Sequence, residues 1–272
     1  MTYQISLKWF DINCVNPKFK YSILSLLLIL VIMVESKCEK KVSPVARFRS
    51  LGLEQRLAWI NREYSGKWLM STSFGIQSAV LLHALSSRYP KIPIIFIDTG
   101  YLFKETYSFA ISLTKRLSLN LFTYGAMRSP AYQEVLFGKR WEKSAEDLAN
   151  YNMENKIEPM NRAIKEFGAS AWVSGIRWTQ SKTRKKRSFI EKQNKVLKIY
   201  PILDWTDKEI FLYLKEHNLP YHPLWNEGYV SVGDVHSTKK LSIGMSEEDT
   251  RFSGYKRECG LHEDTNNIHF QI

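Results

Sequence analysis

The residue in this sequence that is best suited to covalent chemistry is Cys259, in the run KRECGLH near the C-terminus. Basic residues stand on its N-terminal side, among them Arg251 and Arg257, and His262 follows it. Positive charge favours the thiolate over the thiol, and the thiolate is the nucleophilic form. A cysteine on a tail can also be carried to a substrate that is bound elsewhere. A lone buried thiol that serves as a small hydrophobic side chain is the alternative, and Cys259 alone does not exclude it.

A serine-rich segment, STSFGIQS at 71–78, follows an apolar run and precedes a helical pattern. Gly75 allows a tight turn there, and the hydroxyls with the first helical N–H groups form an anion cradle at the positive end of the helix dipole. An ordinary strand-to-helix turn capped by serine is the commoner structure for such a segment. The GxxxxGK[ST] pattern of a P-loop is absent. The candidate anion-binding residues are Ser71, Ser73, Phe74, Gly75, Gln77 and Ser78.

Two more polar segments follow apolar runs. Asp98, Thr99 and Gly100 end one run, where they could hold a ribose hydroxyl, a base or a metal, or form a simple turn. The segment 177–187 has six basic residues in eleven, which fits a solvated loop, a nucleic-acid patch or a clamp for the phosphates of a small molecule. Interleaved Ser, Thr and Gln suit discrete phosphate oxygens and favour the clamp. Its candidate residues are Arg177, Gln180, Ser181 and Arg184.

Composition narrows the class of protein. The chain has 272 residues, of which 44% are hydrophobic, and this is enough for one sizeable core. A net charge of +12 favours an anionic partner, either nucleic acid, a membrane surface or a phosphorylated small molecule. Three cysteines without a CxxC pair argue against a disulfide framework and against a cysteine-ligated zinc or iron–sulfur site. We therefore expect no bound metal and a reducing, cytoplasmic setting.

The elements that must position these residues alternate in type. A helical pattern begins at Leu53, and apolar strands are predicted over 68–74, 92–97, 119–124 and 171–175. Helices are predicted over 76–87 and 104–117, with another that ends near Phe167. Apolar strands that alternate with amphipathic helices predict an α/β fold with a doubly wound, mostly parallel sheet. Ligands of such sheets bind at the carboxyl ends of the strands, where the polar segments fall.

The N-terminal residues match no domain pattern. The apolar run 21–34, of 14 residues, is short for a membrane span and resembles the hydrophobic region of a signal peptide. No small-residue cleavage site follows it. We favour a third explanation, in which Met33 is the true initiator and residues 1–32 are upstream sequence. Residues 1–48 are accordingly expected to be an extension outside the fold.

Read together, the polar segments and the tail resemble the phosphoadenylyl-sulfate (PAPS) reductase family. The segment 71–79 resembles that family's modified PP-loop, and KRECGLH resembles its C-terminal motif. Further blocks of the same family occur in the expected order, so that the likeness covers roughly residues 50–263. These blocks are DTGYLF at 98–103, KIEPMNR at 156–162, PILDW at 201–205, YHPLW at 221–225 and GYVSVGD at 228–234.

The resemblance implies a sheet of the adenine nucleotide alpha-hydrolase-like (PP-loop) type, with a PAPS-binding domain over 49–235 and a catalytic tail over 236–272. It also implies that Cys259 attacks the sulfate sulfur, releases adenosine 3′,5′-bisphosphate and carries an S-sulfonate. Reduced thioredoxin or glutaredoxin then releases sulfite, as part of assimilatory sulfate reduction. Arg257 and His262 match the motif as substrate contacts. The family suggests a homodimer that needs no bound cofactor, no nucleic acid and no membrane.

Two departures refine this expectation. Relatives that use the non-phosphorylated adenylyl sulfate usually carry two cysteine pairs for a four-iron cluster, and this chain has neither pair. The related ATP pyrophosphatases have Lys-Asp where Ile76 and Gln77 stand, which counts against ATP hydrolysis. An adenylating enzyme would leave Cys259 without a role. A nucleic-acid-binding module would explain the charge, but neither the PP-loop nor the tail.

Overall fold

The computed structural model of the chain describes residues 43–193, 195–251 and 261. The chain divides into two compact units, Met1–Arg47 and Phe48–Ile272. Helix α2 (Pro44–Arg49) crosses the boundary between them. The sheet and the helices discussed below belong to the second unit.

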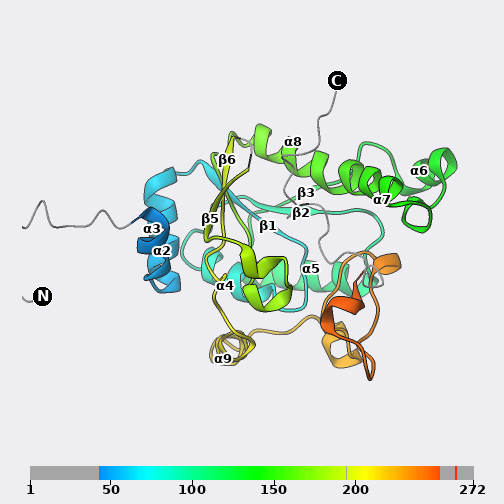
Figure 1. The fold of residues 1–272 in the computed structure, drawn as a ribbon. Coiled ribbons are helices and arrows are strands. Elements are labelled where there is room, and N and C mark those ends of the chain that lie inside the picture. Colours follow the sequence, from blue (N-terminus) through cyan, green and yellow to red (C-terminus); the bar gives the residue numbers. More distant parts are fainter. Residues whose placement is uncertain (1–42, 194, 252–260, 262–272) are drawn as a thin grey trace, which may run out of the picture. The chain divides into compact units, whose positions relative to one another are not determined.

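A six-stranded sheet forms the centre of this unit (Figure 1). Its strands in spatial order are β3 (Leu121–Tyr124), β2 (Ile94–Ile97), β1 (Trp68–Thr72), β4 (Ala171–Val173), β6 (Val196–Ile199) and β5 (Ile190–Gln193). Neighbouring strands run parallel except β5, which pairs antiparallel with β6. The doubly wound, mostly parallel sheet predicted from the sequence is therefore confirmed.

Helices cover both faces of the sheet. In Figure 1, α8 lies on one side and α4 and α5 lie on the other. The remaining described α-helices are α3, α6, α7 and α9, and a π-helix joins α7 to α8. The bounds are α3 Leu53–Tyr64, α4 Ala79–Ser86, α5 Lys104–Leu117, α6 Pro130–Phe137, α7 Ala145–Asn152, the π-helix Met153–Ile157, α8 Glu158–Glu166 and α9 Asp207–Glu216. Within 43–193, 195–251 and 261, no helix is long and apolar enough to cross a membrane.

The core under α8 shows why the apolar runs become strands. Leu69, Ile95 and Ile97 alternate with residues on the opposite sheet face, and together with Trp172 they pack against Met160 of α8. All of these side chains are buried. A strand buried on both faces reads as a continuous apolar run, which is the pattern that predicted β1, β2 and β4.

The structure shifts two predicted boundaries at the serine-rich segment. Strand β1 ends at Thr72, because Phe74 adopts a left-handed conformation with φ of 47° and its N–H donates to Thr72 Oγ1 at 3.0 Å. Helix α4 begins at Ala79 instead of Ile76, because the intervening residues form a turn in which the Ser78 N–H donates to the Gly75 carbonyl. The polar segment is therefore a longer loop than the sequence predicted.

Successive strands are added first on one side of β1 and then, starting with β4, on its other side. From β1 the chain proceeds to β2 and β3 on one side, and it returns to place β4 and β6 on the other. At such a switch point the loops that leave neighbouring strands diverge and open a crevice at the carboxyl ends. The serine-rich segment after β1 and the basic segment after β4 both begin there.

Candidate functional site

A cavity of about 490 Å³ lies at this switch point. A volume of this order is in the range of sites that hold small organic ligands. Its walls come from the loops after β1, β2 and β4, from the π-helix and from the segment after α9. Its polar lining residues include Ser71, Thr72, Ser73, Gln77, Ser78, Thr99, Lys156, Ser174, Arg177, Gln180, Arg184, Asp207, Ser231, Asp234, Glu247 and Arg251.

The end of β1 and the loop after it present hydroxyls to this cavity. Ser71 Oγ accepts a hydrogen bond of 2.7 Å from the indole of Trp172, which fixes it against β4. Ser73 is exposed, and Ser78 Oγ is buried without a hydrogen-bond partner among the described residues. Phe74 points the other way: it is fully buried and packs edge-on against Phe96, with ring centroids 5.1 Å apart. Its left-handed backbone anchors the loop and turns the neighbouring hydroxyls outward.

The residues after β2 divide between the turn and the cavity. Asp98 Oδ1 accepts from the Gly100 N–H at 2.8 Å and from Tyr107 OH at 2.7 Å, so its carboxylate holds the turn. Gly100 has φ of 74°, which glycine adopts without strain. Thr99 is the member of this group that lines the cavity, and its hydroxyl donates to Asp234 Oδ1 at 2.6 Å.

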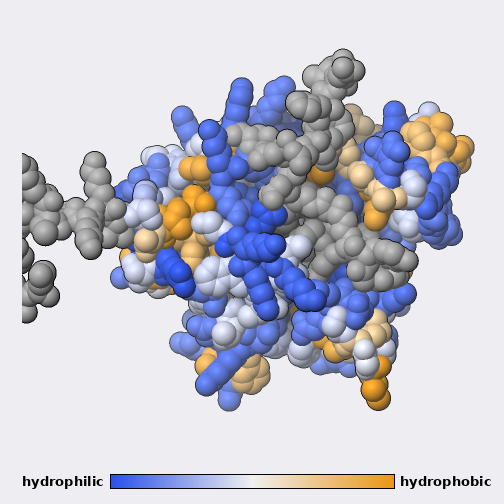
Figure 2. All heavy atoms as spheres, viewed as in Figure 1, coloured by the Kyte–Doolittle hydropathy of each residue, from blue (hydrophilic) through white to orange (hydrophobic). Residues whose placement is uncertain are grey.

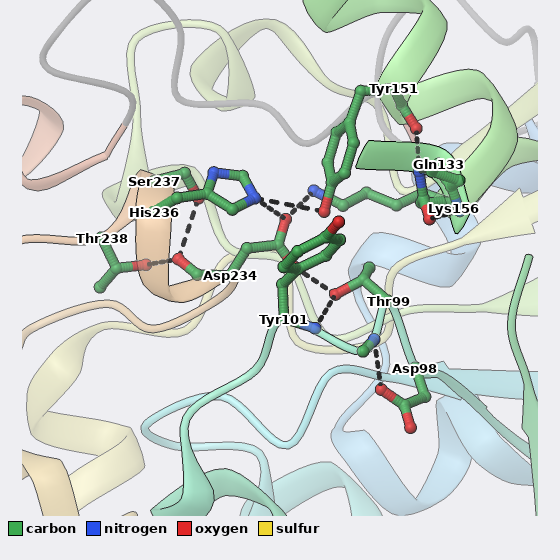
Figure 3. A network of polar contacts seen from close by, with 12 residues as sticks. Asp98, Thr99, Tyr101, Gln133, Tyr151, Lys156, Asp234, His236, Ser237 and Thr238 are labelled. Carbon is green, nitrogen blue, oxygen red and sulfur yellow. Dashed lines mark hydrogen bonds and ion pairs between the residues drawn. The ribbon is translucent and has the colours of Figure 1, made fainter. Parts of the chain in front are cut away.

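Asp234 is the centre of a buried polar network, shown in Figure 3. Its Oδ2 lies 2.6 Å from Lys156 Nζ, and the two side chains are 1% and 7% exposed. Burial by itself raises the pKa of Asp234, but the Lys156 charge and the hydrogen bonds from Lys156 and Thr99 outweigh it and lower that pKa to about 2. The Asp234 carboxylate is therefore ionised at neutral pH. It joins the loop after β2, the π-helix and the segment around 234.

Aromatic rings enclose one side of this network. The His236 imidazole stacks on Trp141 with ring centroids 3.9 Å apart, and its Nε2 lies 3.3 Å from Tyr151 OH. Burial lowers the pKa of His236 to about 4; the Asp234 carboxylate opposes this shift, whereas the charges of Lys156 and Arg251 add to it. Burial likewise raises the pKa of Tyr151 far above its usual range. These side chains are therefore neutral near pH 7, and they shield the ion pair from water.

Arg177 lies between the loop after β1 and helix α9. Its side chain is buried, and its guanidinium donates to Asp207 at 2.8 Å, to Thr179 at 2.9 Å and to Gln77 Oε1. Through these hydrogen bonds the Arg177 guanidinium connects the loop after β1 to helix α9, and it also lines the cavity.

The basic segment continues beyond Arg177 along the rim. The Arg184 guanidinium donates to Gln180 Oε1, and both residues line the cavity. Ser181 instead stabilises the local turn, since its Oγ accepts from the Arg184 N–H at 3.2 Å. Figure 2 shows a strongly hydrophilic surface in the middle of this view, where Figure 1 places β5, β6 and the segment that precedes them.

Three further segments complete the walls. Tyr221 and Trp225 stack with ring centroids 5.1 Å apart on an aromatic side of the cavity. Arg251 is a buried basic lining residue just before 252–260. Leu261 also lines the cavity, and its carbonyl accepts a hydrogen bond from Lys198.

The structure thus brings together nine of the residues singled out in the sequence. Those that line the cavity are Ser71, Ser73, Gly75, Gln77, Ser78, Thr99, Arg177, Gln180 and Arg184. Four are placed beside the cavity in supporting positions, namely Phe74, Asp98, Gly100 and Ser181. Cys259, Arg257 and His262 lie outside the described residues.

The cavity also has three charged lining residues that were not predicted from the sequence to bind substrate, namely Lys156, Asp234 and Arg251. Lys156 and Asp234 belong to the segments 156–162 and 228–234, but nothing in a single sequence indicates that they pair. Arg251 was noted only as a basic neighbour of Cys259. In the part of the chain that the structure describes, no group of three His, Cys, Asp or Glu side chains is placed to hold a metal ion.

Comparison with known proteins identifies the family of this chain. Residues 67–240 match the family model "Phosphoadenosine phosphosulfate reductase domain". A phosphoadenosine 5′-phosphosulfate reductase of Zymomonas mobilis is 52% identical over 217 residues, which cover 80% of this chain and 89% of that protein. The enzyme of the same name from Vibrio parahaemolyticus is 51% identical over 217 residues, covering 80% and 84% of the two chains.

Solved structures show the same relationship. The PAPS reductase of Candida auris, determined as a phosphate complex, superposes with a TM-score of 0.62 at 28% identity over 72% of this chain and 94% of that one. The FMN adenylyltransferase of Candida glabrata superposes with a TM-score of 0.51 at 21% identity over 74% and 67% of the two chains, a likeness of fold alone. Because about half of the aligned residues are identical to curated relatives and the family model matches most of the chain, this chain belongs to the phosphoadenosine phosphosulfate reductase family.

Proposed function

We propose that this protein reduces PAPS to sulfite and adenosine 3′,5′-bisphosphate through a covalent intermediate on Cys259. The observation that carries the proposal is the cavity at the switch point between β1 and β4. Hydroxyls of the loop after β1 and four basic side chains, Lys156, Arg177, Arg184 and Arg251, line it. Its polar groups suit an anionic nucleotide, and its volume suits one small molecule.

Several features support an anion in this cavity. Ser78 Oγ has no partner among the described residues, and it stands where helix α4 begins, so a phosphate or sulfate oxygen could accept a hydrogen bond from its hydroxyl. The N–H groups at the start of α4 and the dipole of that helix favour negative charge. The Candida auris relative was determined as a phosphate complex. The stacked rings of Tyr221 and Trp225 offer the aromatic wall that a purine base requires.

The chemistry begins with the thiolate of Cys259. It attacks the sulfate sulfur, forms an S–S bond and breaks the bond between that sulfur and the bridging phosphate oxygen. Adenosine 3′,5′-bisphosphate leaves with the electron pair, and Cys259 carries a sulfonate. Basic side chains offset the repulsion between an anionic nucleophile and an anionic centre, and they stabilise the leaving phosphate. Leu261, two residues after Cys259 in the sequence, lines the cavity.

The second half of the reaction needs an external dithiol. A thiolate of reduced thioredoxin or glutaredoxin attacks Cys259 Sγ and displaces sulfite, which carries away the electron pair of the broken S–S bond. The second thiol of the donor then resolves the mixed disulfide and frees Cys259. The donor is oxidised to its disulfide while sulfur is reduced from sulfate to sulfite. The proposal also includes that the protein is a homodimer in the cytoplasm and holds no metal or organic cofactor.

One assay tests this function. Wild-type protein is incubated with PAPS or with adenylyl sulfate, with reduced thioredoxin as the donor and without ATP or Mg²⁺, and released sulfite is measured. We expect sulfite from PAPS, much less from adenylyl sulfate, and none without a donor. An absence of sulfite from PAPS with thioredoxin and with glutaredoxin would refute the proposal. Release of pyrophosphate from ATP would favour the adenylating enzymes that share the fold.

A further inference from the structure

Gly233 and Arg251 lie on the same wall of the cavity. Arg251 is 5% exposed, although it carries a guanidinium, and its backbone pairs with Thr238 in an isolated antiparallel bridge. Charged side chains are rarely this buried, and the surrounding structure must then hold them in place. The position of the Arg251 guanidinium therefore depends on the atoms that lie against it.

The guanidinium of Arg251 lies directly over the backbone of Gly233. A Cβ atom built on Gly233 would lie 2.7 Å from Arg251 Cζ and nearer still to both Nη atoms. Nonbonded heavy atoms are most stable at about 3.5–4.0 Å, so any side chain at 233 displaces the guanidinium. The other two cavity-lining glycines differ, since the nearest atoms to a Cβ would be 3.6 Å away at Gly75 and 3.4 Å away at Gly175.

The backbone at 233 does not itself require glycine. Gly233 is not among the residues with positive φ, whereas Gly228, at the start of the same segment, has φ of 88°. Alanine could therefore adopt the backbone conformation of residue 233 without the strain that a positive φ imposes. A side chain at 233 would therefore act by displacing the guanidinium and not by straining the backbone.

We infer that Gly233 is a positioning residue for substrate binding, because its missing side chain lets Arg251 hold an anionic group of the nucleotide at this wall. The inference rests on the proposed function. The neighbouring Asp234 fixes Lys156 on the same side of the cavity through their 2.6 Å ion pair. Residues 233 and 234 thus position two cations. The Asp234 carboxylate holds Lys156, and the missing side chain of Gly233 leaves room for the guanidinium of Arg251.

A double-mutant cycle tests this inference. The variants are Gly233→Ala, Arg251→Ala and the double substitution, and the measurements are KM and kcat with PAPS, the affinity for adenosine 3′,5′-bisphosphate, and the midpoint of thermal unfolding. Gly233→Ala and Arg251→Ala should each raise KM about tenfold or more, since each removes a charge-assisted phosphate contact. The double variant should match Arg251→Ala in KM, in affinity and in midpoint, because no guanidinium then remains to be displaced.

Gly228→Ala is the matched control. It adds backbone strain in the same segment, but nothing lies within 4 Å of its Cβ, so Arg251→Ala should not relieve its effect on the unfolding midpoint. If Gly233→Ala fails to fold, the inference requires that the double variant folds like Arg251→Ala.

Two outcomes overturn the inference. Additive effects of the two substitutions would show that Gly233 acts independently of Arg251, and an unchanged KM in Gly233→Ala would show that the guanidinium is not needed where it lies. A wild-type protein that releases no sulfite from PAPS would instead refute the proposed function. The cycle in unfolding midpoints would in that case still test the relation between the two residues.

Discussion

The ammonium of Lys156 lies 2.6 Å from Asp234 Oδ2, and both side chains are buried beside the cavity. An ion pair removed from water is stabilised by its own attraction, and that attraction must offset the desolvation of two charges. The loss of one partner therefore costs more than the loss of both. This asymmetry makes the pair testable.

Lys156→Met should destabilise the protein by about 3 kcal/mol at pH 7, because it leaves the Asp234 carboxylate buried without its counter-charge. The double substitution Lys156→Met with Asp234→Asn should recover part of this loss, since the amide is neutral and its oxygen can still accept from Thr99. Unfolding by urea, followed by fluorescence, measures both variants. A double variant less stable than Lys156→Met would contradict the assignment.

His222 predicts a dependence of stability on pH. It is fully buried, its Nδ1 accepts from the Leu224 N–H at 3.2 Å, and its Nε2 lies 3.0 Å from Thr106 Oγ1. Burial lowers the pKa of His222 to about 4 from its ordinary value of 6.5, although Glu105 opposes the shift. Between these two pH values the unfolded chain binds more protons than the folded one. Folding stability from this group is therefore fully present above pH 6.5 and falls by about 3 kcal/mol as pH drops to 4.

The measurement is the free energy of unfolding across this range for wild type and His222→Gln. The variant should be less stable at pH 7 and should lose stability more slowly as pH falls, because it removes one of the buried groups that resist protonation. NMR should show no titration of the His222 ring above pH 5. A ring that titrates near pH 6.5 would show that His222 is open to solvent.

The rim of the cavity offers a matched pair of basic residues. Arg184 lines the cavity, whereas its neighbour Lys185 is exposed and does not line it. Arg184→Ala should raise KM for PAPS about tenfold, because it removes a charge-assisted contact to the nucleotide. Lys185→Ala should change KM less than twofold while changing the net charge equally. Equal effects of the two substitutions would show that general attraction, and not a local contact, acts at this rim.

The sequence predicted strands β1 to β4, of which β3 is one edge of the sheet, and missed β6 and the opposite edge strand β5. Strands β1, β2 and β4 are apolar runs, and this composition indicates that both of their faces are buried. Strands β5 and β6 contain charged residues. Lys198 is 2% exposed, and its ammonium lies 3.8 Å from the centre of the Trp172 ring and donates to Gln193 and Leu261. A buried lysine whose partners come from other segments cannot be recognised from local pattern.

The candidate site could likewise be predicted from the sequence only in part. Loops at strand ends were predictable, because a parallel sheet brings those ends to one edge. The direction of each side chain within a loop was not, since it depends on backbone angles such as the positive φ of Phe74. Pairings between distant loops, such as Lys156 with Asp234, are set by tertiary structure alone. Sequence could therefore locate the cavity but not its internal ion pairs.

Cys259→Ser tests the chemical step of the proposed function. Serine keeps the size and hydrogen bonding of cysteine, but its hydroxyl stays protonated near neutral pH, so transfer of the sulfonate should fail. We expect no detectable sulfite from this variant. Affinity for adenosine 3′,5′-bisphosphate should be retained, because the cavity-lining side chains that we propose as phosphate contacts do not include Cys259. Cys38→Ser is the control and should keep full activity.

The intermediate itself can be trapped by withholding the donor. Wild-type protein mixed with PAPS alone should gain the mass of one SO₃ group on the peptide that contains Cys259, and Cys259→Ser should gain none. Reduced thioredoxin should then remove that mass and release an equal amount of sulfite, which makes the kinetics ping-pong. Full sulfite production by Cys259→Ser would contradict the mechanism, because no bond to sulfur could then have formed at residue 259.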